Sequence, residues 1–221
     1  ISEIYPEWFG AKGYDNVDDT KALKKVLSIA KEYKNSVNIL ISIGIFNISE
    51  TLLVSSQEGN VKSINLIGTS MSTSSQNGSS FIWNGKENET MIKIQNINLS
   101  HLANIDFHGK DKAKHNLELK PFVNQFFISN CSFKGCKEFG SSNINLNKGN
   151  NIQVSEIHID NCTFHGVAGP NNSFLTDSGI SGGLANTKNF YIRNCSFMGY
   201  SKAAINIETS DIVTVENCTF A

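Results

Sequence analysis

The sequence is poor in arginine, proline and long apolar runs, and each shortage excludes a class of protein. Arg193 is the only arginine among 221 residues and the net charge is −1, so the chain lacks the basic surface that binds nucleic acid. The longest apolar stretch, residues 37–46, is well short of the roughly 18 residues that a membrane-spanning helix needs. The composition therefore predicts a polar protein with no nucleic-acid partner and no membrane insertion.

Cysteine is present, but its placement argues against a disulfide framework. Four of the five cysteines occupy the same place in a repeated phrase, Asn-Cys-Ser/Thr-Phe, at Cys131, Cys162, Cys195 and Cys218. Side chains that stack in parallel have poor geometry for a disulfide. We interpret these four as small buried apolar groups. Cys136 lies outside the repeat, and the pattern does not explain it.

Each repeated phrase changes the parity of its apolar residues at the asparagine. In residues 157–164, Ile157 and Ile159 share one parity, whereas Cys162 and Phe164 share the other. A straight strand would send one of these pairs into water, because alternate residues point to opposite faces. A bend at Asn161 places both pairs inside, and asparagine tolerates the left-handed backbone of such a bend. The same switch occurs at Asn130, Asn194 and Asn217.

The spacing of the phrases predicts a solenoid. Successive phenylalanines from Phe133 to Phe220 lie 31, 33 and 23 residues apart, with most of the variation in one loop of each repeat. Leucine-rich repeats also carry a repeated asparagine, but here Phe, Ile and Val dominate. We therefore predict an all-β fold, a right-handed single-stranded parallel β-helix of roughly six to seven coils with three short strands in each.

One helix is predicted, near the N-terminus. Asp18 or Asp19 can cap it, and its apolar stripe covers the open edge of the first coil. Capping is also preferred to a metal site at residues 15–19. The expected organisation is one domain, 1–221, with the cap and helix in 1–36 and the coils in 37–221. Because no capping element follows the last repeat, the chain is expected to be truncated at its C-terminus. The stripe comprises Ala22, Leu23, Val26, Leu27, Ala30 and Tyr33.

The stretch WFGAKGYDNVDDTKAL (8–23) resembles the opening signature of the pectate-lyase-like right-handed β-helix superfamily, with a departure at Tyr14. The later Asn-Cys-Ser/Thr-Phe phrases are similar to the asparagine ladder of that superfamily, so the resemblance covers nearly the whole chain. It implies the same fold. It is less informative about activity, because the superfamily includes polysaccharide lyases, glycoside hydrolases, epimerases and phage tailspikes.

The resemblance also implies that saccharides lie along one sheet, flanked by variable loops. The matching strands are 143–147, 179–183 and 203–208. If Ile144, Ile180 and Ile205 point inward, an outward row of amides and hydroxyls faces the sugar. The substrate-binding candidates are Asn145, Asn147, Ser181 and Asn206 on the strands, with Glu138, Lys148 and Lys202 from the loops.

Two chemistries remain open at such a sheet. A hydrolase needs two carboxyl groups flanking the bond, about 5–5.5 Å or 6.5–9.5 Å apart, and Asp177 with Glu208 is the best pair. A lyase needs a base, either His165 or Lys202, and a calcium ion is expected only in that case. No other cofactor is expected. Each candidate also has an ordinary structural role, such as a turn cap for Asp177 or an exposed strand acid for Glu208.

The predicted function is a carbohydrate-active enzyme that binds and cleaves an extracellular polysaccharide, as a lyase or a glycoside hydrolase. The alternative is a non-catalytic structural or receptor-binding module, such as a segment of a phage tailspike, which would form a homotrimer. Both place the protein outside the cell, either secreted or on a virion. The arginine base of pectate lyases and the paired aspartates of polygalacturonases have no counterpart here, which argues against pectin as the substrate.

Overall fold

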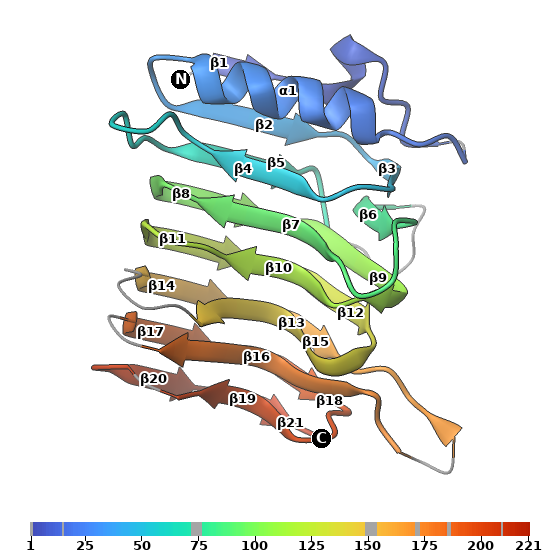
Figure 1. The fold of residues 1–221 in the computed structure, drawn as a ribbon, viewed down its shortest axis with the longest axis vertical. Helices are drawn as coiled ribbons and strands as arrows, with labels where there is room; N and C mark the ends of the chain where they lie inside the picture. The colour runs from blue at the N-terminus through green and yellow to red at the C-terminus, as the bar shows by residue number, and fades with distance from the viewer. Residues whose placement is uncertain are drawn as a thin grey trace.

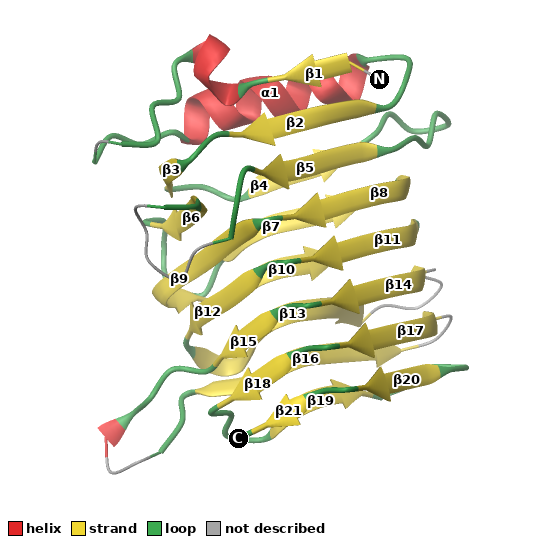
Figure 2. Ribbon diagram, turned by 180° about the vertical axis from the view of Figure 1, so that it is seen from behind, coloured by secondary structure: helices red, strands yellow, loops and turns green. Residues whose placement is uncertain are grey.

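The chain winds into a solenoid of three parallel sheets, A, B and C (Figure 1). The structure is a computed structural model, and it describes residues 2–14, 16–71, 77–148, 154–170, 173–184, 187–208 and 210–221. Each coil passes through sheet A, then B, then C, and the strands of one sheet pair only with strands of the coils before and after. Figure 2 shows the strands of sheet A stacked one above another, with the helix α1 across the first coil.

The strands of each sheet follow one another at intervals of one coil. Sheet A holds β1 (Ser2–Ile4), β2 (Val37–Ile41), β5 (Ile64–Gly68), β8 (Ile97–Ala103), β11 (Val123–Ser129), β14 (Val154–Asp160), β17 (Thr187–Arg193) and β20 (Val213–Glu216). Sheet B holds β3 (Gly44–Ile48), β6 (Ser79–Trp83), β9 (Ile105–Ala113), β12 (Ser132–Cys136), β15 (Thr163–His165), β18 (Ser196–Met198) and β21 (Thr219–Phe220). Sheet C holds β4 (Leu52–Ser55), β7 (Thr90–Gln95), β10 (His115–Leu119), β13 (Glu138–Lys148), β16 (Thr176–Leu184) and β19 (Ala203–Ile207). The predicted right-handed parallel β-helix is confirmed, and its described residues form six three-strand coils and a seventh of β20 and β21.

The asparagine corners lie where the sequence places them, between sheets A and B. The φ angles of Asn130, Asn161, Asn194 and Asn217 are 51°, 53°, 53° and 52°, all in the left-handed region. The cysteines that follow them are free thiols, and three of the four are buried, with Cys218 in the last coil partly exposed. The interpretation as buried groups is confirmed for Cys131, Cys162 and Cys195, and it is wrong for Cys218. Cys136, which the repeat did not explain, is also free and buried, in β12.

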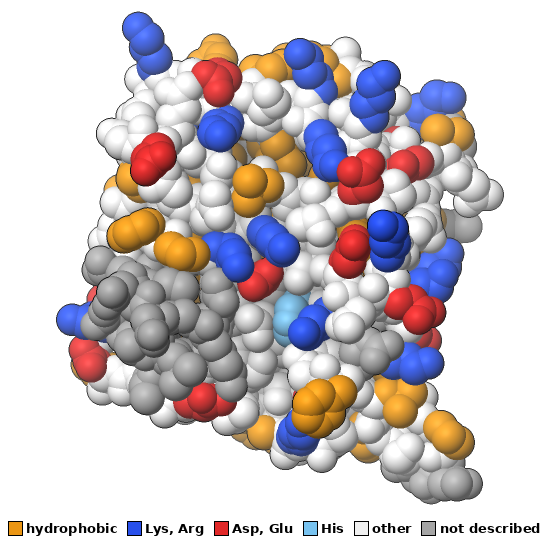
Figure 3. All heavy atoms as spheres, viewed as in Figure 1, with side chains coloured by type: hydrophobic (Ala, Val, Ile, Leu, Met, Phe, Trp, Pro, Cys, Tyr) orange, Lys and Arg blue, Asp and Glu red, His pale blue; other side chains and the backbone are white. Residues whose placement is uncertain are grey.

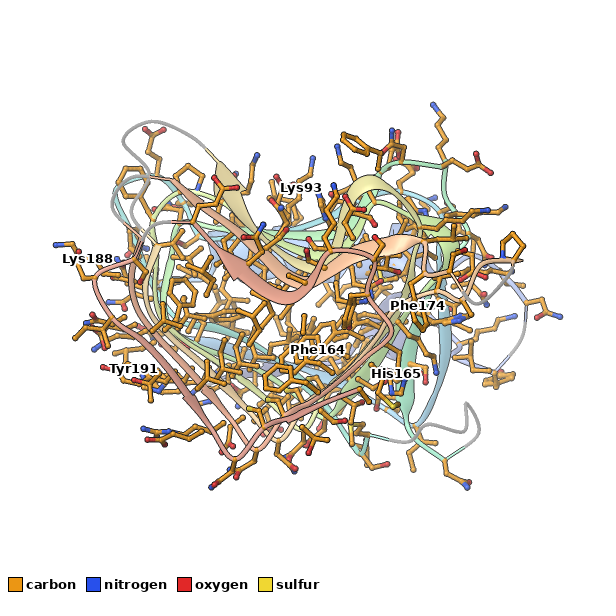
Figure 4. The ribbon with its side chains drawn as sticks, turned by 90° about the horizontal axis from the view of Figure 1, so that it is seen from below. Lys93, Phe164, His165, Phe174, Lys188 and Tyr191 are labelled. Carbon is orange, nitrogen blue, oxygen red and sulfur yellow. The ribbon has the colours of Figure 1, made fainter. Side chains whose placement is uncertain are left out.

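Stacked phenylalanines fill the centre of the solenoid. The rings of Phe107, Phe133, Phe164 and Phe197 follow one another in successive coils, with centroids 5.0, 5.2 and 4.6 Å apart. Each of these side chains is at most 1% exposed. Figure 4, which looks along the solenoid, shows Phe164 pointing into this core. The repeated phenylalanine of the sequence is therefore the core residue of sheet B.

The N-terminal segment covers the first coil. A short 3-10 helix, η1 (Pro6–Phe9), precedes α1 (Thr20–Glu32), the only α-helix in the described ranges, whose apolar stripe from Ala22 to Ala30 is buried. Asp18 Oδ1 accepts the backbone N–H of Thr20 at 3.0 Å. The carboxylate of Asp19 instead accepts the backbone N–H groups of Lys12 at 2.9 Å and Asn47 at 3.1 Å, which joins the helix start to β3.

The prediction of the apolar stripe is wrong for one residue. Tyr33 has extended backbone angles at the C-terminal end of α1, and its side chain is 39% exposed, so it does not belong to the buried face. Residue 15, which the sequence placed near a capping group, lies outside the described residues. No helix within the described ranges is long and apolar enough to cross a membrane.

Candidate functional site

The outward face of sheet C carries a continuous row of polar side chains. Ile144, Ile180 and Ile205 pair with one another across β13, β16 and β19, as the sequence predicted. Consequently Asn145, Ser181 and Asn206 also pair in register, one in each coil. The row continues toward the N-terminus through Glu118 and Lys93, which neither the repeat nor the resemblance had indicated.

A groove of about 410 Å³ lies along this row. In Figure 3 a histidine is visible near the centre of this face, with acidic and basic side chains around it. The floor is formed by strand residues of sheet C, and the rim by residues at the beginning of these strands. The groove is lined by Lys114, His115, Glu118, Gly140, Ser141, Asn145, Asp177, Ser178, Ser181, Lys202 and Asn206.

Asp177 is held at the rim as a paired anion. Its Oδ2 accepts hydrogen bonds from Lys202 Nζ at 2.7 Å and from the backbone N–H of Gly140 at 2.7 Å, while Oδ1 accepts from Ser201 Oγ at 3.2 Å. Burial opposes the charge of this carboxylate. The hydrogen bonds from Lys202 and Gly140 outweigh it, and the net effect is to lower the pKa of Asp177. The group is therefore ionised at neutral pH, and it cannot donate a proton.

Glu118 is the second carboxylate of the groove, and it also lies among cations. Its Oε1 is 3.3 Å from Lys120 Nζ, and its Oε2 is 3.9 Å from Lys93 Nζ. The Glu118 side chain is only 13% exposed, whereas the Lys93 side chain is 38% exposed. In Figure 4, Lys93 extends from the outer side of sheet C. The two lysines therefore carry positive charge to the surface beside a carboxylate that is largely covered.

His115 lies at the base of the groove, at the start of β10. The backbone N–H of Ser142 donates to its Nδ1 at 3.1 Å, and Ser142 Oγ is 3.0 Å from the same atom. Burial lowers the pKa of His115 to about 4, against smaller opposite effects from the Ser142 backbone and Glu118. The imidazole is therefore neutral at neutral pH, and its Nδ1 also lies 3.2 Å from the Ser142 carbonyl oxygen.

An exposed aromatic ring stands at the same rim. Lys202 Nζ lies 4.4 Å from the ring centroid of Phe139, which is 87% exposed. A cation over an aromatic face gives a modest attraction at an exposed site. Lys202 is thereby positioned by both Asp177 and Phe139 at the entrance of the groove.

The sequence-predicted site residues divide into three sets. Asp177, Lys202, Asn145, Ser181 and Asn206 all line the groove. Glu138, Asn147 and Lys148 have their backbone in β13, but their side chains lie outside the described part of the structure. The structure places Glu208 and His165 elsewhere.

Glu208 follows β19 and is not among the described residues that line the groove. Because Ile180 pairs with Ile205, Asp177 and Glu208 are offset by six residues along the strands. That offset corresponds to about 20 Å, far beyond the separations of roughly 5–9.5 Å in glycosidases. The register therefore gives no support to these two residues as a hydrolytic pair.

His165 ends β15 in sheet B, on another face of the solenoid from Lys93, as Figure 4 shows. It lines a separate cavity with His108 and Lys134. The sequence interpretation made it a candidate base beside the sugar on sheet C. Instead it continues the strand after the buried Phe164, so the alternation of that strand turns its side chain outward from sheet B.

Six groove residues were missed from the sequence: Gly140, Ser141 and Ser178, and the titratable Lys114, His115 and Glu118. The last three come from β10 and the residue before it, in the coil before the first Asn-Cys-Ser/Thr-Phe phrase, where no repeat marks the register. The available signal was the triplet Leu117-Glu118-Leu119, which has the same alternation as Ile144-Asn145-Leu146 and pairs with it. Among the described residues, no group of three or more His, Cys, Asp or Glu side chains is placed to hold a metal ion.

No protein-family model and no curated protein matches the sequence. Solved structures do. ORF18 of Geobacillus virus E2 superposes with a TM-score of 0.64 at 10% identity, over 99% of this chain and 52% of that one. The pre-mature bacteriophage phi29 gene product 12 gives a TM-score of 0.62 at 16% identity, over 87% of this chain and 25% of that one. An alginate lyase from Paenibacillus gives 0.57 at 13% identity, over 99% of this chain and 76% of that one.

At these identities the likeness shows the fold. The chain is a right-handed parallel β-helix, an architecture that it has in common with phage proteins and with polysaccharide-active enzymes. The fold that the sequence resemblance implied is confirmed. The chain spans about half of the first of these proteins and about a quarter of the second.

Proposed function

We propose that this protein binds an acidic extracellular polysaccharide along sheet C and cleaves it in the groove. The observation that carries the proposal is the composition of the groove and its border. Four lysines, Lys93, Lys114, Lys120 and Lys202, accompany two carboxylates, Glu118 and Asp177, so this set has an excess of two positive charges. Both carboxylates already have cationic partners.

The row Asn145–Ser181–Asn206 supports the same conclusion. Amide and hydroxyl groups repeat at the coil spacing of about 4.8 Å along a shallow, open surface. Such groups donate and accept hydrogen bonds in turn, as sugar hydroxyl groups require. Cations beside them would neutralise uronate carboxylates. The groove therefore suits a chain of sugar rings that carry acidic groups.

Of the two chemistries, β-elimination fits the groove better than hydrolysis. A glycosidase needs a carboxylic acid that stays protonated near neutral pH, with its pKa raised. The pKa of Asp177 is lowered instead. In an elimination, lysines neutralise the uronate carboxylate, a base removes the proton from C5, and the bond from C4 to the glycosidic oxygen breaks. The C5 electron pair forms the C4–C5 double bond, and the leaving oxygen takes a proton from water.

His115 is the residue that we assign as the base in this proposal. It is neutral at neutral pH and lines the groove beside Lys114. Lys202 would then bind the substrate carboxylate rather than remove a proton, since it donates to Asp177. A calcium ion could add to the neutralisation, so the activity is to be measured with and without it.

A second candidate function is a non-catalytic module of a virion that binds a cell-surface polysaccharide. The two phage proteins, with TM-scores of 0.64 and 0.62, favour it. Such a module would use the same groove for binding and would be expected to form a homotrimer. Under either function the protein works outside the cell or on a virus particle.

The test is a panel of acidic polysaccharides (alginate, polygalacturonate, hyaluronan) and neutral ones (dextran, xylan), each assayed for reducing ends and for absorbance near 235 nm. We expect both signals from an acidic member only. Lys202→Met should abolish most of this activity. Lys188→Met is the matched control, because Lys188 also pairs with an aspartate, at 3.8 Å, but on sheet A.

Reducing ends without absorbance would indicate hydrolysis and overturn the elimination step. Binding of an acidic polysaccharide without any cleavage, by a protein that is trimeric in light scattering, would establish the second candidate instead. Activity on neutral polymers alone would contradict the charge argument.

A further inference from the structure

A second cavity, of about 630 Å³, lies at the turn from sheet C to sheet A in the first coils. Its volume falls in the range of roughly 300–1,000 Å³ that is typical of small-ligand sites. The wall is formed by Pro121, Phe122 and Val61, and amide and hydroxyl side chains, among them Gln95, Asn96 and Asn124, surround it. This cavity is separate from the groove, and the groove residues play no part in it.

Phe122 has a backbone conformation that its side chain does not favour. Its φ angle is +61°, in the left-handed region, where a bulky residue is an outlier. Nothing in the core compensates for this strain, since the Phe122 side chain is 53% exposed. An exposed aromatic ring on a strained backbone points to function rather than to packing.

The preceding coil shows what the corner itself requires. Asn96 occupies the same position one coil earlier, with φ of +52°, and its backbone N–H donates to Pro121 O at 3.0 Å. The next residue, Ile97, donates to Phe122 O at 3.0 Å. Asparagine can therefore occupy this corner, because it tolerates the left-handed conformation. Phenylalanine at this position adds a flat apolar surface to the cavity. The corner itself does not need that ring.

The polar groups around the ring are held in fixed positions. Asn96 Nδ2 donates to Gln57 O at 2.9 Å and to Ser56 O at 3.3 Å, which leaves its Oδ1 as an acceptor at the cavity wall. Asn124 Oδ1 accepts from Ser155 Oγ at 2.7 Å, which leaves the amide Nδ2 of Asn124 as a donor. A half-exposed ring with a fixed acceptor and a fixed donor beside it matches a pyranose, which has an apolar C–H face and hydroxyl groups around its edge.

We propose that the cavity around Phe122 is a second saccharide-binding site, in which one pyranose ring stacks on Phe122 and its hydroxyl groups bind Asn96 and Asn124. This proposal rests on the proposed function in one respect only, which is that the ligand is a saccharide. Binding at this site does not require cleavage in the groove. Lys93 and Gln95 are two residues apart in β7, one beside Glu118 of the groove and the other in the cavity wall. A polysaccharide that crosses sheet C can therefore reach both sites.

The experiment is two-dimensional amide NMR with disaccharides as probes: cellobiose, maltose, chitobiose and a mannuronate disaccharide. We expect at least one to shift the amide signals of Asn96, Phe122 and Asn124. Phe122→Asn, which copies the corner of Asn96, should weaken that binding at least tenfold, in line with the loss of a stacked ring. Phe122→Tyr, which keeps the ring, should bind within about threefold of the wild type. Tyr14→Asn, which removes an exposed ring elsewhere, should bind as the wild type.

The melting temperature of Phe122→Asn should be equal to or above that of the wild type, because asparagine relieves the strained backbone. Phe122→Gly, which also accepts the left-handed conformation, serves as a second variant. The proposal is overturned if no disaccharide shifts these signals, if Phe122→Asn binds as the wild type, or if both variants unfold. Lys202→Met separates this result from the proposed function: it should stop cleavage in the groove and leave the Phe122 shifts intact.

Discussion

The side-chain amide of Asn161 donates a hydrogen bond of 2.5 Å to Oδ1 of Asn130, the equivalent corner residue one coil earlier. Asn217 makes the same contact with Asn194 at 3.5 Å. Each of Asn161 and Asn217 thus has two roles. It accepts a left-handed backbone, and it joins its coil to the coil before it.

We expect Asn161→Val to lower the free energy of unfolding by more than about 1 kcal/mol, because a β-branched residue resists the left-handed corner. Asn161→Gly separates the two roles, since glycine accepts the corner but removes the amide. Its loss should be smaller than that of the valine variant. Urea denaturation measures both. Equal stability of the valine variant and the wild type would show that the corner carries no strain.

A second prediction concerns the Asp177–Lys202 pair. The pKa of Asp177 is lower in the folded state than in the unfolded state. The ionised carboxylate of Asp177 therefore stabilises the fold above the unfolded pKa of about 3.9. This stabilisation is lost as the pH falls through the lower pKa of the folded state. Asp177→Asn should cost about 2 kcal/mol at pH 7, and the difference from the wild type should shrink below about pH 4. Denaturation curves over pH 2–8 would test this; the matched variant Asp211→Asn, at an exposed pair, should change stability by less than about 0.5 kcal/mol.

His115 gives a pH dependence in a different window. Its folded pKa of about 4 is below the unfolded value near 6.5, so between these values the unfolded state binds more protons. Stability should therefore decrease as the pH falls from about 6.5 to 4, by up to roughly 3 kcal/mol from this group. Burial also lowers the pKa values of His108, His158 and His165, which contribute with the same sign.

The variant that isolates this effect is His115→Gln. It should reduce the slope of stability against pH between about 4 and 6.5, without abolishing it. An unchanged slope would mean that folding does not lower the pKa of His115.

The cysteines should behave as buried thiols. Burial raises the pKa values of Cys136 and Cys162, and the contact with Cys162, together with burial, raises the pKa of Cys195. Their reactive thiolate forms are therefore suppressed. With a thiol-specific chromogenic reagent, the native protein should react slowly and first at Cys218, which is partly exposed. In denaturant without reductant, all five thiols should be titrated. A smaller number would reveal a disulfide.

The repeat made the last coils predictable from the sequence. Each Asn-Cys-Ser/Thr-Phe phrase fixes the phase of its coil, so the pairing of Ile144, Ile180 and Ile205 followed from counting residues. The same reasoning could not find Glu118 and His115, because the earlier coils lack the phrase. It also misplaced His165, because sequence alone does not say where a strand ends and a loop begins.

A second column of residues with a left-handed backbone shows more clearly what could not be predicted from the sequence. Leu99, Gln125, Glu156 and Asn189 lie one above another in sheet A, with φ angles of 51°, 48°, 55° and 52°. Only one of the four is asparagine. The other coils impose the conformation through their pairing, and local preference does not reveal it.

The pairing of each strand with the coils on either side affects how fast its backbone amide protons exchange with deuterium. In such a nearest-neighbour array, opening begins at the terminal coils and propagates inward. Amide protons of β11 and β14, which have coils on both sides, should therefore exchange with deuterium more slowly than those of β20. The Asn130–Asn161 contact joins these two central coils, so its loss should bring their exchange rates closer to those of the terminal coil.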